Sequence, residues 1–165
     1  MCTPSPAQPR FTIRPLTGMD DPCAERWRTL RDELFETTDD ADSLLETREI
    51  LTDGSTRGMS YAVFLAVDLH RPDAILGFVE VALRRFAEGC RTDPVGFIEG
   101  WMVLESARGH GIGGALVARA EDWAREHGCT EMASDAELEN HPSDAAHRAL
   151  GYREVARIRC FAKDL

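Results

Sequence analysis

The stretch ARGHGIGGALVARAEDWA (107–124) places four glycines directly before a run of apolar residues at helical spacing. Ile112, Leu116, Ala120 and Trp123 fall on one face of a helix that begins within the glycines. Glycines at a helix start let other groups approach the backbone N–H groups closely, and the helix dipole favours an anion there. The stretch therefore predicts an anion-binding turn between a strand and a helix.

Several kinds of glycine-rich turn compete for this stretch. A Walker A loop needs a lysine followed by Ser or Thr, and the stretch contains no lysine. GHGIGG (109–114) has the spacing of a dinucleotide-binding fingerprint, but it stands past the middle of the chain, after runs typical of antiparallel strands. A tight turn without a ligand would also use glycine, although it needs fewer of them.

The first half of the chain predicts a strand, two helices and a meander. The Pro- and Ser-rich residues 1–9 have little to bury, so we expect a flexible lead before a single domain over 10–165. FTIRPL (11–16) alternates like a half-buried strand, and helices are expected within 20–35 and 41–54. Asp42 or Ser43 could cap the second helix and Gly54 could end it. Three apolar runs with short links then predict an antiparallel meander: YAVFLAVDL (61–69), AILGFVEVALR (74–84) and DPVGFIEGWMVL (93–104).

The second half predicts a crevice at the carboxyl end of a central strand. After the long helix, CTEMASDA (129–136) reads as a strand, PSDAAHRALG (142–151) as a short helix and YREVARIRCFAK (152–163) as one or two closing strands. Where a strand, a helix and a parallel strand follow one another, ligands bind outside the strand ends. The glycine stretch stands at that junction.

Composition limits the partners. The formal charge is −10, with 29 acidic and 19 basic side chains, which opposes nucleic acid or an anionic membrane and favours a cationic partner, although many soluble proteins share such a charge. The five cysteines are scattered without a CxxC or Cys/His cluster, so neither a metal site nor a disulfide framework is expected. With no apolar run of membrane-spanning length, a reduced cytoplasmic protein is the simplest interpretation.

Residues 108–113, Arg-Gly-His-Gly-Ile-Gly, match the pattern R/Q-x-x-G-x-G/A, and in this the chain resembles the GNAT acetyltransferases. The similarity is closest to the bacterial aminoglycoside 6'-N-acetyltransferases. The runs that carry it are 93–100, 103–117, 120–140 and 145–155. The resemblance implies an α/β (α+β) GNAT fold, with a mixed, largely antiparallel central sheet flanked by helices and a splay between the central strands. It also implies acetyl-CoA as donor without a metal, a cationic small-molecule amine as acceptor, and a homodimer whose second subunit covers an open sheet edge.

The same resemblance assigns residues to the donor. The pyrophosphate of acetyl-CoA would lie on the backbone of the glycine loop, and a free N–H of the central strand would polarise the thioester oxygen. Asn140 would bond the pantetheine arm, although an Asn at a helix start is also a good N-cap. The cofactor-binding residues so implied are Trp101, Met102, Val103, Arg108, Gly109, His110, Gly111, Ile112, Gly113, Gly114 and Asn140.

Three side chains are expected to act in the reaction. Glu99 interrupts the apolar run VGFIEGWMV and needs a cationic partner, either the substrate or a structural salt bridge. Asp135 ends a strand at the crevice, where a carboxylate could accept the proton of the attacking amine. His147 stands where many relatives place a tyrosine that protonates the departing thiolate, but a histidine here could equally be packed and satisfied.

The acceptor side departs from the usual pattern. Phe35 stands where a tryptophan is common, Phe86 where a tyrosine is common, and Ala156 where an acid often lies. With Glu99 and Asp135, Phe35 and Phe86 make up the expected substrate site. Three functions stay open: an aminoglycoside 6'-N-acetyltransferase, an acetyltransferase for another amine such as a polyamine or peptide, and a sensor that binds acetyl-CoA without turnover.

Overall fold

The structure is a computed structural model that describes residues 10–37 and 41–164. The expected flexible lead (1–9) lies outside the described residues, as do Thr38, Asp39 and Asp40. The strands are β1 (Phe11–Pro15), β2 (Ser55–Thr56), β3 (Met59–Asp68), β4 (Arg71–Arg84), β5 (Val95–Val103) and β6 (Met132–Ser134). The helices are α1 (Ala24–Phe35), α2 (Ala41–Asp53), the 3-10 turn Glu105–Ala107, α3 (Ile112–Glu126) and α4 (His141–Ala149).

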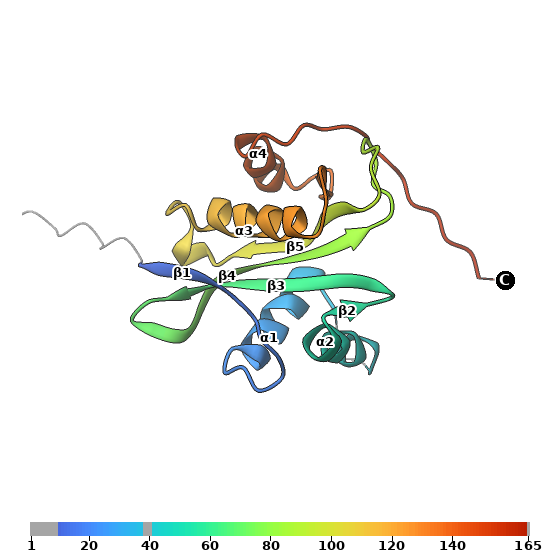
Figure 1. Cartoon of the computed structure of the whole chain (residues 1–165). Helices are drawn as coiled ribbons and strands as arrows, with labels where there is room; N and C mark the ends of the chain where they lie inside the picture. Colours follow the sequence, from blue (N-terminus) through green and yellow to red (C-terminus); the bar gives the residue numbers. More distant parts are fainter. Residues whose placement is uncertain (1–9, 38–40, 165) are drawn as a thin grey trace, which may run out of the picture.

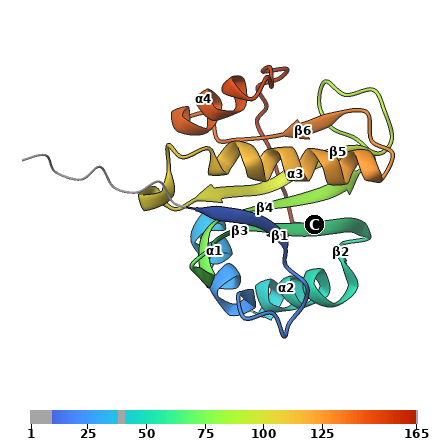
Figure 2. The ribbon, with the colours of Figure 1, turned by 60° about the vertical axis from the view of Figure 1, so that its left-hand side comes forward.

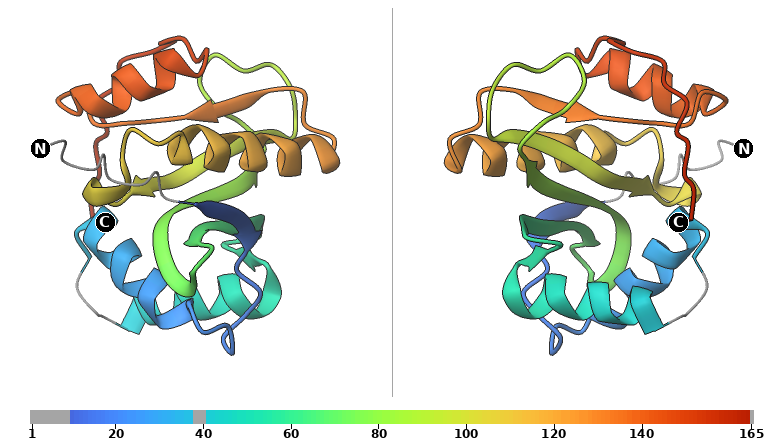
Figure 3. Two further views of the ribbon diagram at one scale, coloured as in Figure 1. Left: turned by 90° about the vertical axis from the view of Figure 1, so that its left-hand side faces the viewer. Right: turned by 90° about the vertical axis from the view of Figure 1, so that its right-hand side faces the viewer.

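The strands form a six-stranded mixed sheet in the order β1-β3-β4-β5-β6, with β2 paired to β3. All neighbours are antiparallel except β5 and β6, which are parallel and joined through α3. Helices α1 and α2 lie against one face of the sheet and α3 against the other (Figures 1 and 3). Figure 2 shows α4 on the α3 side, away from α1 and α2. The predicted meander, the strand–helix–parallel-strand unit and the mixed, largely antiparallel sheet flanked by helices are therefore confirmed.

Alternation along β3 and β4 divides the core in two. One set of side chains packs under α3, with Val79, Val81 and Leu116 among them. The other set packs under α1 and α2 and includes Trp27 and Phe78. Because strand side chains alternate between faces, both faces of the central strands must be apolar, which explains their nearly continuous hydrophobic sequence.

The helix boundaries follow the expected signals with one exception. Gly128 has φ +84° just after α3, and Gly54 has φ +59° after α2, where its N–H donates to Ile50. Helix α2 begins at Ala41, so Asp42 and Ser43 lie inside its first turn and do not cap it from outside. The Ser43 hydroxyl instead donates to the Asp32 carboxylate of α1, which ties the two helices together.

The closing strands predicted for 152–163 are absent from this chain's own sheet. From Tyr152 to Asp164 the described chain forms no helix or strand, and it runs away from the body of the molecule (Figure 1). Val155, Ile158 and Phe161 in this tail are exposed to 47%, 57% and 91%. Residues 152–163 have a strand-like composition, but they pair with no strand of the described chain. No helix of the described chain is long and apolar enough to cross a membrane.

Candidate active site

The two parallel strands β5 and β6 separate at the middle of β5. They pair only from Gly96 to Ile98, whose partners run from Met132 to Ser134. Beyond Ile98, β5 continues to Val103 with β4 on one edge and, among the described residues, no strand on the other. The separation leaves backbone groups of Trp101–Val103 beside a gap at the carboxyl ends of both strands, where the implied splay was expected.

Glu99 lies in a β-bulge at the mouth of this gap. Opposite β4, Glu80 pairs with Gly100 and Val81 with Ile98, so Glu99 is the extra residue of β5. Bulges re-aim side chains and often occur beside active sites. The Glu99 side chain is 15% exposed, whereas the apolar residues before it in the strand are buried.

The Glu99 carboxylate is held by Arg84, the last residue of β4. Arg84 donates from Nε to Oε1 at 2.7 Å and from Nη2 to Oε2 at 2.5 Å. Its guanidinium lies 3.5 Å from the ring centroid of Phe97. Burial lowers the pKa of Arg84, but the hydrogen bonds and charge of Glu99, with the charge of Asp135, outweigh burial and raise it. The structural salt bridge expected as one possible role for Glu99 is present. The Glu99 side chain is still partly exposed, so a ligand can bond it as well.

Asp135 follows β6 directly and is exposed. Its side chain forms no hydrogen bond or ion pair with other described residues, yet its charge reaches Arg84. Asp135 and Glu99 therefore share one cationic neighbour across the gap. Of the two carboxylates, Asp135 is the one that bonds no other described residue, whereas Arg84 takes part of the acceptor capacity of Glu99.

The glycine loop leads into α3 as expected. Gly109 and Gly111 have φ of +78° and +80°, and no atom lies within 4 Å of a Cβ built on either. Ala115 is the first helical donor to Gly111, so the N–H groups of 112–114 have no acceptor within the helix. Arg108 is anchored by Nε to the Val103 carbonyl at 3.1 Å. Open space, free N–H groups, the helix dipole and an arginine together suit a phosphate group.

Two buried nitrogens on this side lack a partner within the described residues: Trp101 Nε1 and His110 Nδ1. Buried polar atoms without a partner are rare and point to a missing ligand or water. The Trp101 ring also explains Gly113, because a Cβ there would lie 3.0 Å from Trp101 Cζ2. Gly113 thus gives space to a tryptophan on β5, whereas Gly109 and Gly111 leave open the space in front of the helix.

Asn140 and His147 are both satisfied locally. Asn140 Oδ1 accepts from the Ser143 N–H at 3.1 Å and caps α4, which leaves the side-chain NH2 as a donor. His147 Nδ1 lies 2.8 Å from the Ser143 carbonyl oxygen, and Nε2 lies 2.9 Å from the Ser134 hydroxyl. Its ring stands edge-on to Trp101 and Tyr152. A donor bond to the Ser143 carbonyl fixes the proton on Nδ1, so Nε2 accepts from Ser134 in the neutral form.

Phe35 and Phe86 have different surroundings. Phe35, at the end of α1, is 38% exposed and borders Gly100, where a Cβ would meet its Cζ at 3.0 Å. The structure thus brings Phe35 beside the Glu99 bulge. Phe86 is 68% exposed in the connection after β4, and Ala156 lies in the exposed tail.

A buried cluster around Glu80 was not singled out by the sequence. Glu80 is fully buried and accepts from Trp27 at 3.0 Å, from Arg31 at 3.2 Å and from Tyr61 at 2.5 Å. Arg31 also donates to Glu46 of α2. Burial raises the pKa of the Glu80 carboxyl, and the Arg31 charge and the three hydrogen bonds oppose that shift. The rule that drew attention to Glu99, an acid within an apolar strand, applies equally to VEV (79–81) and would have found it. No spacing signal marked Arg84.

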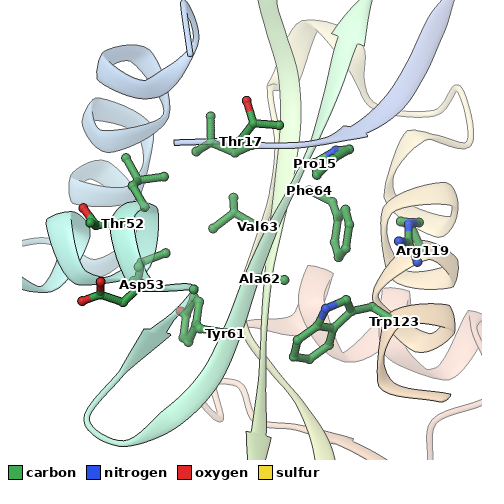
Figure 4. A pocket seen from close by; sticks show the side chains of 14 residues that line it. Pro15, Thr17, Thr52, Asp53, Tyr61, Ala62, Val63, Phe64, Arg119 and Trp123 are labelled. Carbon is green, nitrogen blue, oxygen red and sulfur yellow. The ribbon is translucent and has the colours of Figure 1, made fainter. Parts of the chain in front are cut away.

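A cavity of about 450 Å³ lies elsewhere, at the outer edge of β3 (Figure 4). Its lining includes Tyr61, Phe64, Arg119 and Trp123 and none of the residues expected to act in the reaction. Strands β3, β4 and β5 separate it from the β5–β6 gap. In the part of the chain that the structure describes, no group of three or more His, Cys, Asp or Glu side chains could hold a metal ion.

Comparison with known proteins agrees with this geometry. The sequence pattern of the acetyltransferase (GNAT) family matches residues 24–152. An aminoglycoside N(6')-acetyltransferase type 1 of Klebsiella aerogenes is 45% identical over 142 residues, which cover 79% of this chain and 93% of that protein. The enzyme of the same name from Stenotrophomonas maltophilia is 39% identical over 155 residues, covering 93% of this chain and 94% of the other. The solved structure of AAC(6')-Iy with the bisubstrate analogue CoA-S-monomethyl-acetylneamine superposes with a TM-score of 0.80 at 33% identity, covering 94% of this chain and 99% of that one.

Proposed function

Because the chain belongs to the acetyltransferase (GNAT) family, we propose that it transfers the acetyl group of acetyl-CoA to the 6'-amine of an aminoglycoside, by direct attack in a ternary complex. The observation that carries this proposal is the β5–β6 gap, with two carboxylates on one side and the glycine turn of α3 on the other. The relatives with the same fold over nearly the whole chain are named for that activity.

The donor half of the site is formed by the glycine turn and the free edge of β5. N–H groups of the 109–114 backbone would hold the pyrophosphate, with Arg108 beside it. The two buried nitrogens without partners, of Trp101 and His110, support a ligand at this place. When bound, acetyl-CoA supplies a thioester to an attacking amine. A free N–H group of β5 beyond Ile98, among residues 101–103, would donate to the thioester oxygen as negative charge develops on it.

The acceptor half is formed by the carboxylates and Phe35. A protonated amine cannot attack, so its proton must first pass to a base, directly or through water. We assign that role to Asp135, whose acceptor positions are free within the described residues, and an orienting role to Glu99, which Arg84 already occupies. Phe35 beside the bulge offers an apolar wall to the sugar ring, and Phe86 is a further candidate contact from the loop after β4.

His147 remains a proposal for the return of a proton to the thiolate. Its neutral form accepts at Nε2 from Ser134, so donation to sulfur requires the protonated ring or the Ser134 hydroxyl as an intermediary. Asn140, whose NH2 group is free after capping α4, is a candidate donor to the pantetheine arm.

We also propose a homodimer. The tail 153–164 exposes Val155, Ile158 and Phe161, and apolar side chains exposed together favour coverage by another chain. Light scattering at micromolar concentration should give the dimer mass, and replacement of Ile158 and Phe161 by Asp should give a monomer. A monomeric parent protein would contradict this part of the proposal.

A cytoplasmic location and the absence of nucleic-acid or membrane partners belong to the same proposal. The four described cysteines are free thiols, as a reducing compartment allows: Cys23, Cys90, Cys129 and Cys160. The net charge of −10 disfavours polyanions as partners.

The direct test is thiol release from acetyl-CoA in the presence of a panel of amines. An aminoglycoside with a 6'-amine should release thiol, whereas one with a 6'-hydroxyl, spermidine and a peptide amine should release little. Equal turnover of the two aminoglycosides would refute the regiochemistry. Turnover of spermidine or the peptide alone would leave a GNAT acetyltransferase with another acceptor, and no turnover with intact acetyl-CoA binding would favour a sensor.

A further inference from the structure

Arg84 lies in the acceptor half of the site, although neither the glycine loop nor the fold requires an arginine there. It closes β4 and extends over the Phe97 ring to the bulged Glu99, where it forms a two-point contact with both carboxylate oxygens. A paired contact of this kind fixes both the position and the orientation of a carboxylate. Its side chain is 34% exposed, so the arginine is accessible to solvent as well as bonded to the protein.

The charged groups around Arg84 set the net charge near a bound amine. Glu99 from β5 bonds Arg84 directly, and Asp135 after β6 and Tyr61 of β3 act on it through space. Two carboxylates and one guanidinium leave a net charge of −1 at the mouth of the gap. The site therefore attracts a cation, but the attraction is weaker than that of two unopposed carboxylates.

Glu99 can bond Arg84 and an amine acceptor at the same time. A carboxylate can accept about four hydrogen bonds, of which Arg84 takes two, so an amine can still bond Glu99. An amine bonded there lies within about 4–6 Å of the guanidinium, a distance at which a like charge disfavours the protonated form. The reaction needs the unprotonated amine, because only its nitrogen lone pair can attack the thioester.

We propose that Arg84 is a positioning and specificity-determining residue of the acceptor site, which orients Glu99 and favours the neutral amine over the ammonium ion. This inference rests on the proposed function, since it concerns the amine acceptor. In the step concerned, an N–H proton of the ammonium passes to the Asp135 carboxylate, the N–H bonding pair becomes the nitrogen lone pair, and Asp135 becomes a neutral carboxylic acid. Arg84 keeps its proton throughout.

Three variants test the role. Arg84→Gln removes the charge, Arg84→Lys keeps it without the two-point contact, and Arg85→Gln is a matched control. Arg85 is the next residue, its side chain is 92% exposed, and it bonds Asp93 away from Glu99. All three should remain folded. Arg85→Gln should unfold at the denaturant concentration of the parent protein, because its side chain is exposed, whereas the Arg84 variants lose contacts to the partly buried Glu99 and should unfold at a lower concentration.

The expected results separate charge from shape. In calorimetry with CoA present, Arg84→Gln should bind a 6'-amino aminoglycoside about fivefold more tightly, the effect of one unit charge at about 4 Å in water. Its kcat should fall by a similar factor at neutral pH and recover at higher pH, where the ammonium loses its proton without help. Arg84→Lys should stay close to the parent protein in both measurements, and Arg85→Gln should be unchanged.

Other outcomes overturn the inference. If Arg84 is only a structural clamp, Arg84→Lys will behave like Arg84→Gln, binding will weaken, and the pH dependence of kcat will not move. Equal affinity in the parent protein, Arg84→Gln and Arg85→Gln overturns the role of Arg84 whether or not thiol is released. Tighter binding by Arg84→Gln without thiol release from any of these proteins supports Arg84 and refutes the proposed acetyl transfer.

Discussion

Glu80 and Glu99 lie on neighbouring strands, and an arginine holds each of them, yet their surroundings differ. Glu80 is fully buried, and Trp27, Arg31 and Tyr61 satisfy its oxygens. Glu99 sits in a bulge at the end of the β5–β6 pairing, 15% exposed, with Arg84 as its partner. The first carboxylate has no place for a ligand, whereas the second retains acceptor positions beside an open gap. A charged residue in an apolar strand can thus be structural or functional, and its solvent access and spare hydrogen-bond capacity distinguish the two.

The largest loss of stability should come from removal of the cation that pairs with Glu80. Arg31→Met keeps the side-chain volume but leaves Glu80 buried without its cation, which should lower the free energy of unfolding by about 3–5 kcal/mol. Urea denaturation measures this. Arg26→Met is the control on the same helix, because Arg26 forms an exposed pair with Glu33 at 3.9 Å and should cost under about 1 kcal/mol. Equal losses of unfolding free energy in the two variants would mean that the buried ion pair of Glu80 stabilises the protein no more than an exposed one.

Removal of the free carboxylate should affect catalysis and leave stability intact. Asp135→Asn should lower kcat by about 10²-fold, the range for loss of a positioned acid–base group. Its unfolding free energy and its affinity for acetyl-CoA should not change, since Asp135 is exposed and lies on the acceptor side. Steady-state kinetics of thiol release measure the effect. Glu137→Gln alters an exposed acid two residues away and should keep full activity; a loss of equal size there would indicate a general charge effect.

The affinity for acetyl-CoA should depend on the glycine turn before α3 and not on either carboxylate. Gly111→Val places a side chain in the open space before α3 and should weaken acetyl-CoA binding at least about tenfold, or ~1.4 kcal/mol. Gly128→Val is a matched control at the other end of α3, since Gly128 has φ +84° and equally open surroundings. Both variants carry the same backbone strain, but only the first should lose affinity in calorimetry. Unchanged affinity in folded Gly111→Val would refute the assignment of the glycine turn to the pyrophosphate.

The smallest effect should come from salt. Charge attraction at a partly open site is screened, so KM for the aminoglycoside should rise roughly threefold between low and high ionic strength. The Glu80 cluster is buried and should be insensitive over the same range, which denaturation at both salt concentrations can establish. A KM that is independent of salt would mean that charge attraction does not contribute to binding of the aminoglycoside.

The sequence predicted the meander, the parallel β6 and the start of α3, because apolar alternation and positive-φ glycines are local signals. The resemblance implied that Glu99 and Asp135 belong to one acceptor site, and the apolar run around Glu99 and the strand end before Asp135 supported that prediction. The sequence could not reveal Arg84 as the partner of Glu99, because the bulge that aligns them shifts the register by one residue. It failed for 152–163, whose strand-like composition pairs with no strand of the described chain. It did not anticipate that a Cβ on Gly113 would meet the Trp101 ring, a contact between β5 and α3 that depends on how the helix packs on the sheet.

The position of the transferred acetyl group tests the central claim most directly. A 6'-amino aminoglycoside incubated with the protein and acetyl-CoA labelled with carbon-13 in the acetyl group should give one product. Nuclear magnetic resonance should locate a single labelled acetyl on the 6'-nitrogen, and Asp135→Asn should form the same product more slowly. An acetyl group on another amine or on a hydroxyl, or the absence of any acetylated aminoglycoside, would contradict the account.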